Sequence, residues 1–515
     1  MNSADFLPPE TLTLQAAGAR LLSRFEVGER DEVQSDRTYY DTFDGLLRAR
    51  GLSVVHERGR LALIDRQNGG VRAAIRAPQP GHAMLPMNLE DGPLREALLS
   101  IVDVRALLPL VHVRSRVRGL DVLDNQQKTV VRITLEESAI VSSATRPKPL
   151  RPRVRLAAVR GYDDELAAVR HQLEQELRFT PAEQTLVDEA VHAAGGVPGG
   201  ISSKVDVQLA SDQRADAAAV SVLRALLGVI EANVEGTIDD IDAEFLHDFR
   251  VSVRRSRAVQ RELRGVFPPA ELNTFRAEFR WLQQVTGDAR DLDVYVLSFH
   301  DMRALVPAPV QADLDPLLTV LRERRLTARA AMVTALRSHR ASRLLAEWSA
   351  FLEELVQRDP AERPDATRPI AEVAGERIAR VYRRMVKMGR SIDRASPAAD
   401  YHELRKKGKE LRYLLELFGA QLYPADVVKP MIKSLKALQE VLGRHQDREV
   451  QVATLRTLRD EVAALPGGPG ALMAMGVLVE RLGEDEHAAR RQFAESFEVF
   501  ASRSQRRLVK ETFAA

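Results

Sequence analysis

The chain has 515 residues, enough for roughly two to four domains of ordinary size. Its 75 Lys and Arg residues nearly balance its 73 Asp and Glu residues, so the formal net charge of +2 gives no overall basic coat for nucleic acid. The absence of Cys excludes a disulfide scaffold, a thiolate metal site and a cysteine nucleophile.

Neither a membrane span nor a secretory signal is visible in the sequence. No uninterrupted apolar run approaches the roughly 18 residues that a membrane-spanning helix needs. Residues 1–5 lack the basic region and the following apolar core of a secretory signal. We therefore expect a cytoplasmic protein with no membrane partner.

Residues 1–205 show the pattern of an antiparallel sheet. Turn signals such as Asp44-Gly45 separate short segments, and apolar residues alternate with polar ones at 131–136 and again at 153–156. This alternation gives each strand one apolar face. We expect the first domain to be an antiparallel β-tunnel or barrel.

Two helices interrupt this pattern. Apolar residues recur at helical spacing between 166 and 177, and a second helix is predicted from Pro181 to Ala194. A glycine-rich loop follows at 195–200. We place the domain boundary beyond this loop, near residues 205–215.

Residues 215–515 have the pattern of an all-helical domain. Long stretches rich in Ala, Leu, Arg and Glu keep helical periodicity, and strand signals are absent. A proline-rich stretch near 360–369 divides the domain into halves of about 215–358 and 370–515. The predicted fold class is α+β with two domains.

An internal repeat supports this division into halves. Residues 247–257 and 402–412 fit one pattern of His, acid, apolar residue and Arg, followed by a cation at +7 and Arg at +10. A second pair of motifs, at 282–293 and 438–449, repeats Leu-Gln, Gly and two acidic positions. The offsets are 155 and 156 residues, and a chance similarity would not keep this register twice. We expect a duplicated helical unit with internal two-fold pseudo-symmetry.

Each copy of the first motif places basic side chains on one helix face. Positions 0, +3, +7 and +10 project within about 80° of one another on an α-helix. Stacked cations repel one another, and acids such as Glu262 and Glu410 lie off the stripe, so each stripe favours an external anion. With two neighbours of the stripes included, the candidate ligand residues are His247, Arg250, Arg254, Arg255, Arg257, His402, Arg405, Lys406, Lys409 and Arg412.

The residue types in the stripes favour phosphate as the anion. Arg gives bidentate contacts to phosphate oxygens, Lys gives a point charge, and His gains charge near about pH 6.5. Two related stripes suit an extended, repetitive anion. Tyr413 is the one adjacent aromatic residue, and Asn or Gln side chains that could read bases are absent from these faces. A polymer of phosphates without bases therefore fits better than nucleic acid.

The duplicated helices and their two motif pairs resemble the CHAD domain (conserved histidine α-helical domain) from about residue 215 to the C-terminus. That family is a helical bundle with internal pseudo-symmetry that binds inorganic polyphosphate and is linked to polyphosphate granules. The resemblance implies a polyphosphate ligand and a location at such granules. Transferred position by position, it implies as ligands His247, Arg250, Arg254, Arg257, His402, Arg405, Lys409 and Arg412.

The first domain resembles a CYTH domain, which is often fused to CHAD. The similar segments are residues 39–45, Leu47, residues 51–52 and residues 203–204. CYTH domains form an antiparallel β-tunnel that binds triphosphates, and active members hydrolyse them with a divalent metal. Their signature is ExExK on the first strand, with further Glu pairs on late strands, because Mg²⁺ and Mn²⁺ prefer hard oxygen ligands.

The sequence departs from the CYTH pattern where the chemistry would occur. We assign the first strand to residues 11–15, which contain no acid and no Lys, and a late strand to residues 153–157, which have cations or Ala where acids would stand. Val54 and Val55 occupy a stretch in which basic residues are expected. Thr and Gln are weak ligands for a catalytic metal. We expect a degenerate tunnel with no catalytic residues, no metal and no other cofactor.

Several polar residues outside the stripes need separate interpretation. Asp291, Asp293, Asp447 and Glu449 could bridge phosphate oxygens through Mg²⁺, but we interpret them as helix-cap and salt-bridge residues that orient the arginines. We interpret His445 as a surface histidine.

Taken together, the sequence predicts a non-enzymatic protein that binds inorganic polyphosphate through two basic stripes and associates with polyphosphate granules in the cytoplasm. One alternative is a metal-dependent inorganic tri- or polyphosphatase that acts through the first domain. Another is a nucleic-acid-binding protein, which the scarcity of aromatic residues disfavours.

Overall fold

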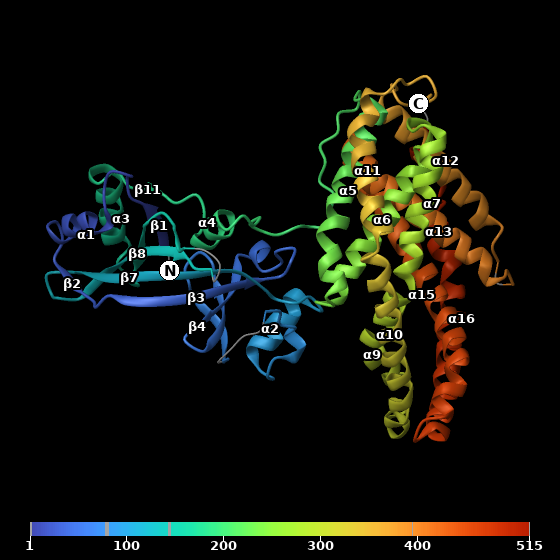
Figure 1. Cartoon of the computed structure of the whole chain (residues 1–515), viewed down its shortest axis with the longest axis horizontal. Coiled ribbons are helices and arrows are strands. Elements are labelled where there is room, and N and C mark those ends of the chain that lie inside the picture. The colour runs from blue at the N-terminus through green and yellow to red at the C-terminus, as the bar shows by residue number, and fades with distance from the viewer. Residues whose placement is uncertain (1–2, 78–81, 143–145, 394, 514–515) are drawn as a thin grey trace. The chain divides into compact units, whose positions relative to one another are not determined.

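The computed structural model describes residues 3–77, 82–142, 146–393 and 395–513. The chain divides into two compact units, Met1–Ser202 and Ser203–Ala515. We call them the sheet unit and the helical unit (Figure 1). The predicted α+β class with two domains is confirmed.

The sheet unit is built on an antiparallel sheet, which has eleven strands among the described residues. Its main path runs β11-β1-β10-β8-β7-β3-β4-β5-β6, while β2 pairs with β7 and β9 pairs with β8. The strands are β1 (Ser3–Leu7), β2 (Val27–Glu29), β3 (Val33–Asp41), β4 (Leu52–Glu57), β5 (Arg60–Asp65), β6 (Val71–Arg76), β7 (Leu108–Leu123), β8 (Thr129–Ile140), β9 (Lys148–Pro149), β10 (Arg153–Ala158) and β11 (Thr180–Pro181).

The alternating segments predicted two neighbouring strands of this sheet correctly. Residues 131–136 lie in β8 and residues 153–156 lie in β10, and the two strands pair in antiparallel register. Ile133 pairs with Leu156, and both side chains are buried. Burial of this one face is what fixes the register, because a shift by one residue would turn every apolar side chain outward.

The predicted first strand at residues 11–15 is wrong. The first strand is β1, Ser3–Leu7, and α1 (Leu14–Leu22) begins inside the predicted segment. Thr13 is the N-cap of α1, and its hydroxyl accepts a hydrogen bond from the backbone N–H of Ala16 at 3.2 Å. A Thr before an apolar stripe is a helix-start signal, which outweighs the short alternation of apolar and polar residues here.

Helices cover parts of the sheet: α1, α2 (Pro93–Val102), α3 (Asp163–His171) and α4 (Leu186–Ala193). The predicted helix at 166–177 corresponds to α3 and the π-helical turn Gln172–Glu176 that follows it. The second predicted helix begins later than expected, because Pro181 belongs to β11 and Thr185 caps α4. Apolar residues of α4 pack against β3, β4, β5 and β7 and fill the space beside these strands.

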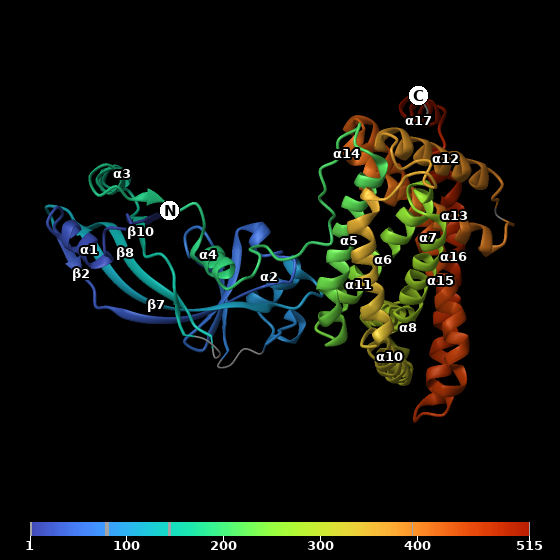
Figure 2. The ribbon, with the colours of Figure 1, turned by 45° about the horizontal axis from the view of Figure 1, so that its top comes forward.

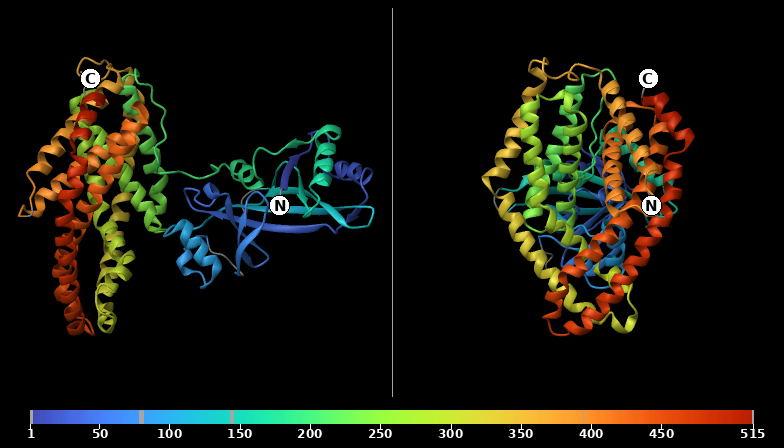
Figure 3. Two further views of the ribbon diagram at one scale, coloured as in Figure 1. Left: turned by 180° about the vertical axis from the view of Figure 1, so that it is seen from behind. Right: turned by 90° about the vertical axis from the view of Figure 1, so that its right-hand side faces the viewer.

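The helical unit is a bundle of long helices (Figures 1 and 2). The helices of its first half are α5 (Ala215–Ile238), α6 (Ala243–Glu262), α7 (Pro269–Val285), α8 (Gly287–Leu297), α9 (Phe299–Ala304), α10 (Asp315–Leu336) and α11 (His339–Glu354). Those of its second half are α12 (Ile370–Arg390), α13 (Ala398–Leu414), α14 (Ala420–Leu422), α15 (Ala425–Ala463), α16 (Gly468–Phe500) and α17 (Arg503–Phe513). The two halves lie side by side in the right-hand view of Figure 3, with the first half in green to yellow.

The internal repeat maps onto corresponding helices. The first motif lies on α6 in one half and on α13 in the other. The second motif crosses from α7 into α8 in the first half but lies within the continuous helix α15 in the second. Thr286, between α7 and α8, is therefore a break that the second half lacks.

One large apolar core joins the two halves. It includes Leu226 of α5, Phe249 of α6, Met385 of α12 and Leu404 of α13, all fully buried. An 18-residue window of α5 has a mean hydropathy of 1.6, which satisfies a length and composition test for a membrane span, and 56% of that window is buried inside the protein. The hydropathy of α5 agrees with its position in this core.

The segment between the halves is held by buried charges. The Arg363 and Asp216 side chains are fully buried, and their charged atoms lie 3.1 Å apart. Backbone hydrogen bonds join the N–H groups of Ala215 and Asp216 to the carbonyls of Arg368 and Ala366. The connection between α11 and α12 is thus tied to the start of α5.

Candidate functional site

A cavity of about 650 Å³ opens between α6, α13 and α15, and we call it the helical groove. Its basic side chains come from both halves, because α6 and α13 each supply several of them. The predicted ligand residues that line it are His247, Arg254, Arg255, Arg405, Lys409 and Arg412. The structure therefore brings six of the ten candidates to one cavity within the described residues.

The two basic helices are fixed by their apolar faces. On α6, Leu246, Phe249 and Val253 are buried, and on α13 Leu404 and Leu411 are buried. Their spacing of three, four or seven residues places them on one side of each helix. The basic residues that line the groove are thereby turned away from this core.

Lys409 is a half-buried basic side chain of the groove, and its pKa is shifted. Burial, and then the charges of Arg405 and Arg254, lowers the pKa of Lys409 to about 8. Within the described part of the chain, no acceptor lies within hydrogen-bond distance of its ammonium group. The charge of Asp447 acts in the opposite direction but does not cancel these effects. A half-buried ammonium without an acceptor, beside two arginines, favours the binding of an anion.

Arg250 and Arg257 do not line the groove. Arg250 is buried and donates to the carbonyl oxygen of Gln283 at 2.8 Å and to Oγ1 of Thr286 at 2.9 Å. Arg257 donates to the side-chain oxygen of Gln283. Burial, and then the charge of Arg254, lowers the pKa of Arg250 to about 10. The contacts of Arg250 join α6 to the end of α7.

His402 also lies outside the groove lining, and it differs from its counterpart His247. Nδ1 of His402 lies 2.6 Å from Oε1 of Gln446 and donates to it, while Gln446 donates to Glu449 at 3.2 Å. Nδ1 of His247 lies 3.0 Å from Nη2 of Arg290, and it accepts because a guanidinium group can only donate. The two halves are therefore not equivalent at their histidines.

Carboxylates compensate part of the basic stripes, although helical spacing places acids such as Glu262 and Glu410 off each stripe. Glu416 follows α13 and lines the groove, where its oxygens lie 2.7 Å from Nε of Arg412 and 3.2 Å from Nη2 of Arg255. Lys406 is exposed and pairs with Glu403 on its own helix, outside the groove. The spacing along one helix could not reveal a pairing such as that of Arg255 with Glu416, because the two residues lie on different segments.

Helix α15 completes the groove with Lys436, Gln439 and Glu440, none of which was a candidate ligand. Gln439 belongs to the repeated Leu-Gln motif, and Lys436 lies about one turn before it. The repeated motif at 438–449 is therefore the sequence feature that could have indicated that α15 forms a wall of the groove. These three residues were not candidates, because the local sequence does not show that α15 lies against α13.

The acidic residues near the groove include ion-pair partners of arginines. Oδ1 of Asp447 lies 3.0 Å from Nη2 of Arg405. Oδ1 of Asp293 lies 2.6 Å from Nε of Arg325, a residue outside the stripes. Burial raises the pKa of Asp291, although nearby arginine charges act in the opposite direction.

The interpretation of His445 as a surface residue is wrong, because its side chain is only 1% exposed. Its ring stacks on Tyr401 with centroids 4.6 Å apart, and its Nε2 lies 2.8 Å from Oε1 of Glu486. Burial lowers the pKa of His445, against the opposing charge of Glu486. The residue is covered because α15 packs along α16, a pairing that the local sequence does not reveal.

Among the described residues, one group has the composition of a metal site: Glu244, His247 and Asp248, whose ligand atoms lie within 4.8 Å of one another. Arg290 lies against this group, with Nη2 3.0 Å from Nδ1 of His247 and 3.7 Å from Oε1 of Glu244. A guanidinium at these atoms competes with any cation. We therefore assign no metal to this group.

The family model of the CHAD domain matches residues 221–456. The helical unit contains a CHAD domain. A crystal structure of the CHAD domain from the plant Ricinus communis is 25% identical, covers 57% of this chain and 95% of that chain, and has a TM-score of 0.49. PptA from Streptomyces chartreusis is 19% identical, covers 56% of this chain and 100% of that chain, and has a TM-score of 0.40. A comparison with curated proteins found no match.

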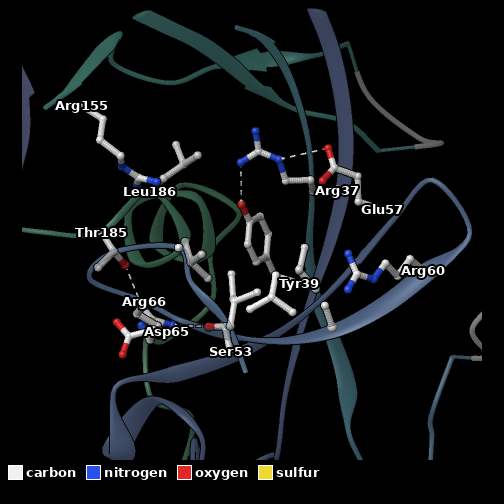
Figure 4. A pocket seen from close by; sticks show the side chains of 16 residues that line it. Arg37, Tyr39, Ser53, Glu57, Arg60, Asp65, Arg66, Arg155, Thr185 and Leu186 are labelled. Atoms are coloured by element: carbon white, nitrogen blue, oxygen red, sulfur yellow. Dashed lines mark hydrogen bonds and ion pairs between the residues drawn. The ribbon is translucent and has the colours of Figure 1, made fainter. Parts of the chain in front are cut away.

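Outside the CHAD domain, the sheet unit has its own cavity of about 240 Å³, lined by β3, β4, β5 and the start of α4 (Figure 4). The antiparallel sheet is consistent with a CYTH-like tunnel. As expected from the sequence, β4 contributes an apolar residue, Val55. Basic residues reach the cavity from other segments, and these are Arg37, Arg60, Arg66 and Arg155.

Carboxylates near this cavity pair with its arginines. Asp5 of β1 receives two hydrogen bonds from Arg155, at 2.6 and 3.0 Å. Glu136 and Glu57 lie 3.2 and 3.6 Å from the guanidinium of Arg37. A divalent metal needs several carboxylate oxygens that face it rather than a cation. These residues therefore do not fit the metal site of an active CYTH-like tunnel.

Proposed function

We propose that the CHAD domain binds inorganic polyphosphate in the helical groove and that the protein has no catalytic role in this binding. The CHAD family match supports a polyphosphate-related role. The observation that carries the finer proposal is the environment of Lys409, whose half-buried ammonium faces Arg254 and Arg405 without an acceptor of its own. A chain of phosphates would give these cations charge-assisted hydrogen bonds.

The lining of the groove favours phosphate over nucleic acid. Tyr413 is the one tyrosine, tryptophan or phenylalanine that lines it within the described residues. Its hydroxyl lies 3.4 Å from Nε of Arg254, and the guanidinium of Arg255 lies over its ring at 5.9 Å. An aromatic ring held by two arginines offers little surface for stacking bases.

The non-catalytic part of the proposal rests on the paired acids of the sheet unit. The carboxylates of Asp5, Glu57 and Glu136 face arginines. They are therefore not arranged to hold a divalent metal that would assist attack on a phosphoanhydride. We place the protein in the cytoplasm, at polyphosphate granules. A fluorescent fusion that stays diffuse in cells rich in granules would contradict this location.

The central experiment is a titration of labelled long-chain polyphosphate into the full chain and into Arg405→Ala/Lys409→Met. Each charge-assisted contact contributes roughly 1.5–3 kcal/mol, so the double variant is expected to bind at least about 100-fold more weakly. Arg322→Ala/Arg456→Ala is the matched control, because it removes two exposed cations of α10 and α15 outside the groove. Equal affinity of the wild type and the groove variant would refute the site.

A competition experiment tests the choice of ligand. Double-stranded DNA added at equal phosphate concentration is expected to leave bound polyphosphate in place. Displacement by DNA would support the nucleic-acid alternative instead.

A further inference from the structure

Three arginines lie together outside the groove, on α6 and α7. Arg276 and Arg280 are one turn apart on α7, on the side that also carries Gln283, and Gln283 accepts from Arg257 of α6. Burial, followed by the charges of Arg261, Arg280 and Arg276, lowers the pKa of Arg257. The three arginines therefore lie close enough to repel one another. We call Arg257, Arg276 and Arg280 the α7 patch.

The α7 patch has no matching acids. In the part of the chain that the structure describes, neither Arg276 nor Arg280 forms an ion pair or a hydrogen bond through its guanidinium, and Arg257 forms no ion pair. The acid Glu278, which lies between the two arginines in sequence, pairs with Arg340 instead. Arginines gathered without acids favour an external anion.

The internal repeat relates this patch to a wall of the groove. At the offsets of 155 and 156 residues, it pairs Arg257 with Arg412, Arg280 with Lys436 and Gln283 with Gln439. The second member of each pair lines the groove. The patch is thus the first half's counterpart of a surface that, in the second half, belongs to the proposed binding site.

The two counterparts differ strongly in charge. The repeat positions in the second half are Arg412, Glu416, Ile432, Lys436 and Glu440, and those in the first half are Arg257, Arg261, Arg276, Arg280 and Gln284. The second half therefore has two cations and two acids, whereas the first half has four cations and no acid. Arg261 is compensated by Glu262 and Glu410, which leaves the three arginines of the α7 patch.

We infer that the α7 patch binds a second stretch of the same polyphosphate chain that occupies the helical groove. This inference rests on the proposed function. Arg254 lines the groove and Arg257 begins the patch one turn further along α6, a rise of about 4.5 Å, so one continuous polymer can contact both. A short phosphate fills the groove alone, and a long chain gains the additional contacts of the patch. The patch therefore sets a preference for long chains.

The test compares two probes, tripolyphosphate and long-chain inorganic polyphosphate, on the wild type and on Arg276→Ala/Arg280→Ala. The variant is expected to bind the long chain about tenfold more weakly and to reduce the slope of log affinity against log salt by about 2. Its affinity for tripolyphosphate is expected to stay unchanged. Arg322→Ala/Arg456→Ala again controls for the loss of two exposed cations.

The outcomes separate this inference from the proposed function. Unchanged long-chain binding in the α7-patch variant, or an equal loss for both probes, overturns the inference while the groove remains the binding site. A wild type that binds neither probe refutes the proposed function itself. Arg276 is half-buried and Arg280 is exposed, so thermal melting of the variant checks that the fold is retained.

Discussion

Polyphosphate binding should depend on pH through Lys409. The unliganded groove holds the pKa of Lys409 at about 8, compared with an ordinary value of 10.5, because of burial and then the charges of Arg405 and Arg254. The negative charge of a bound polyanion outweighs these effects and raises this pKa. Lys409 therefore stays protonated in the complex at a pH at which Lys409 of the free protein has lost its proton.

The sign and size of the effect follow from this difference. Between about pH 7 and 8 the Lys409 ammonium is mostly charged in both states, so its contribution to affinity is nearly constant, whereas above pH 8 the affinity falls as pH rises. If binding restores the value of 10.5, the full gap corresponds to about 3.4 kcal/mol, at about 1.4 kcal/mol for each pH unit. Between about pH 7 and 9.5 the affinity then falls roughly 30-fold.

Two substitutions isolate this effect. Lys409→Arg keeps the charge across the whole range, so its affinity is expected to be constant between about pH 7 and 9.5. Lys409→Met removes the charge, so it binds more weakly at pH 7 and is also independent of pH. Fluorescence anisotropy with labelled polyphosphate measures the affinities, and calorimetry in two buffers of different ionisation enthalpy measures proton uptake. A wild type with constant affinity, or a Lys409→Arg variant that keeps the wild-type slope, would refute the reasoning.

The other predictions concern the acid in the groove, the buried ion pair and catalysis. Glu416→Gln frees Arg255 and Arg412 from their carboxylate and is expected to strengthen polyphosphate binding about three- to tenfold, as measured by anisotropy; weaker binding would contradict a competing role for this acid. Arg363→Met leaves Asp216 with a buried, under-compensated charge, and is expected to lower the free energy of unfolding in urea by about 3–5 kcal/mol. A loss below about 1 kcal/mol would show that the pair contributes little. With Mg²⁺ or Mn²⁺ added, the protein is expected to release no phosphate from tripolyphosphate in a phosphate-release assay, and sustained turnover would restore the enzyme alternative.

The fold could be predicted from local patterns because both domains repeat simple periods. Alternation identified the strand segments at 131–136 and 153–156, and helical periodicity with proline breaks identified the helical region. The first strand was misplaced because residues 11–15 alternate like a strand while Thr13 caps a helix. Such conflicts are decided by packing against distant segments, which the local sequence does not contain.

The groove could be predicted only in part, for a related reason. Residues that share one helix were found from their spacing, and Arg405, Lys409 and Arg412 do line one cavity. Arg250 was included because it lies on the same stripe, but it is buried and donates to Gln283 and Thr286 at the end of α7. Lys436 was missed because it comes from a third helix. Helical spacing shows which residues share one face of a helix, but it does not show which other segment packs against that face.

The groove takes its walls from both halves of the duplicated unit, and so does the apolar core beneath it. A chain with one half alone would carry a single basic helix and an uncovered apolar face. Two such chains could build the same cavity only by associating about a two-fold axis, with each supplying one wall. Covalent fusion replaces that bimolecular step with an intramolecular one, so the cavity forms at any protein concentration. Fusion also allows the two walls to diverge, and the unequal charges of Glu416 and Arg261 at equivalent positions are a difference that an assembly of identical chains could not have.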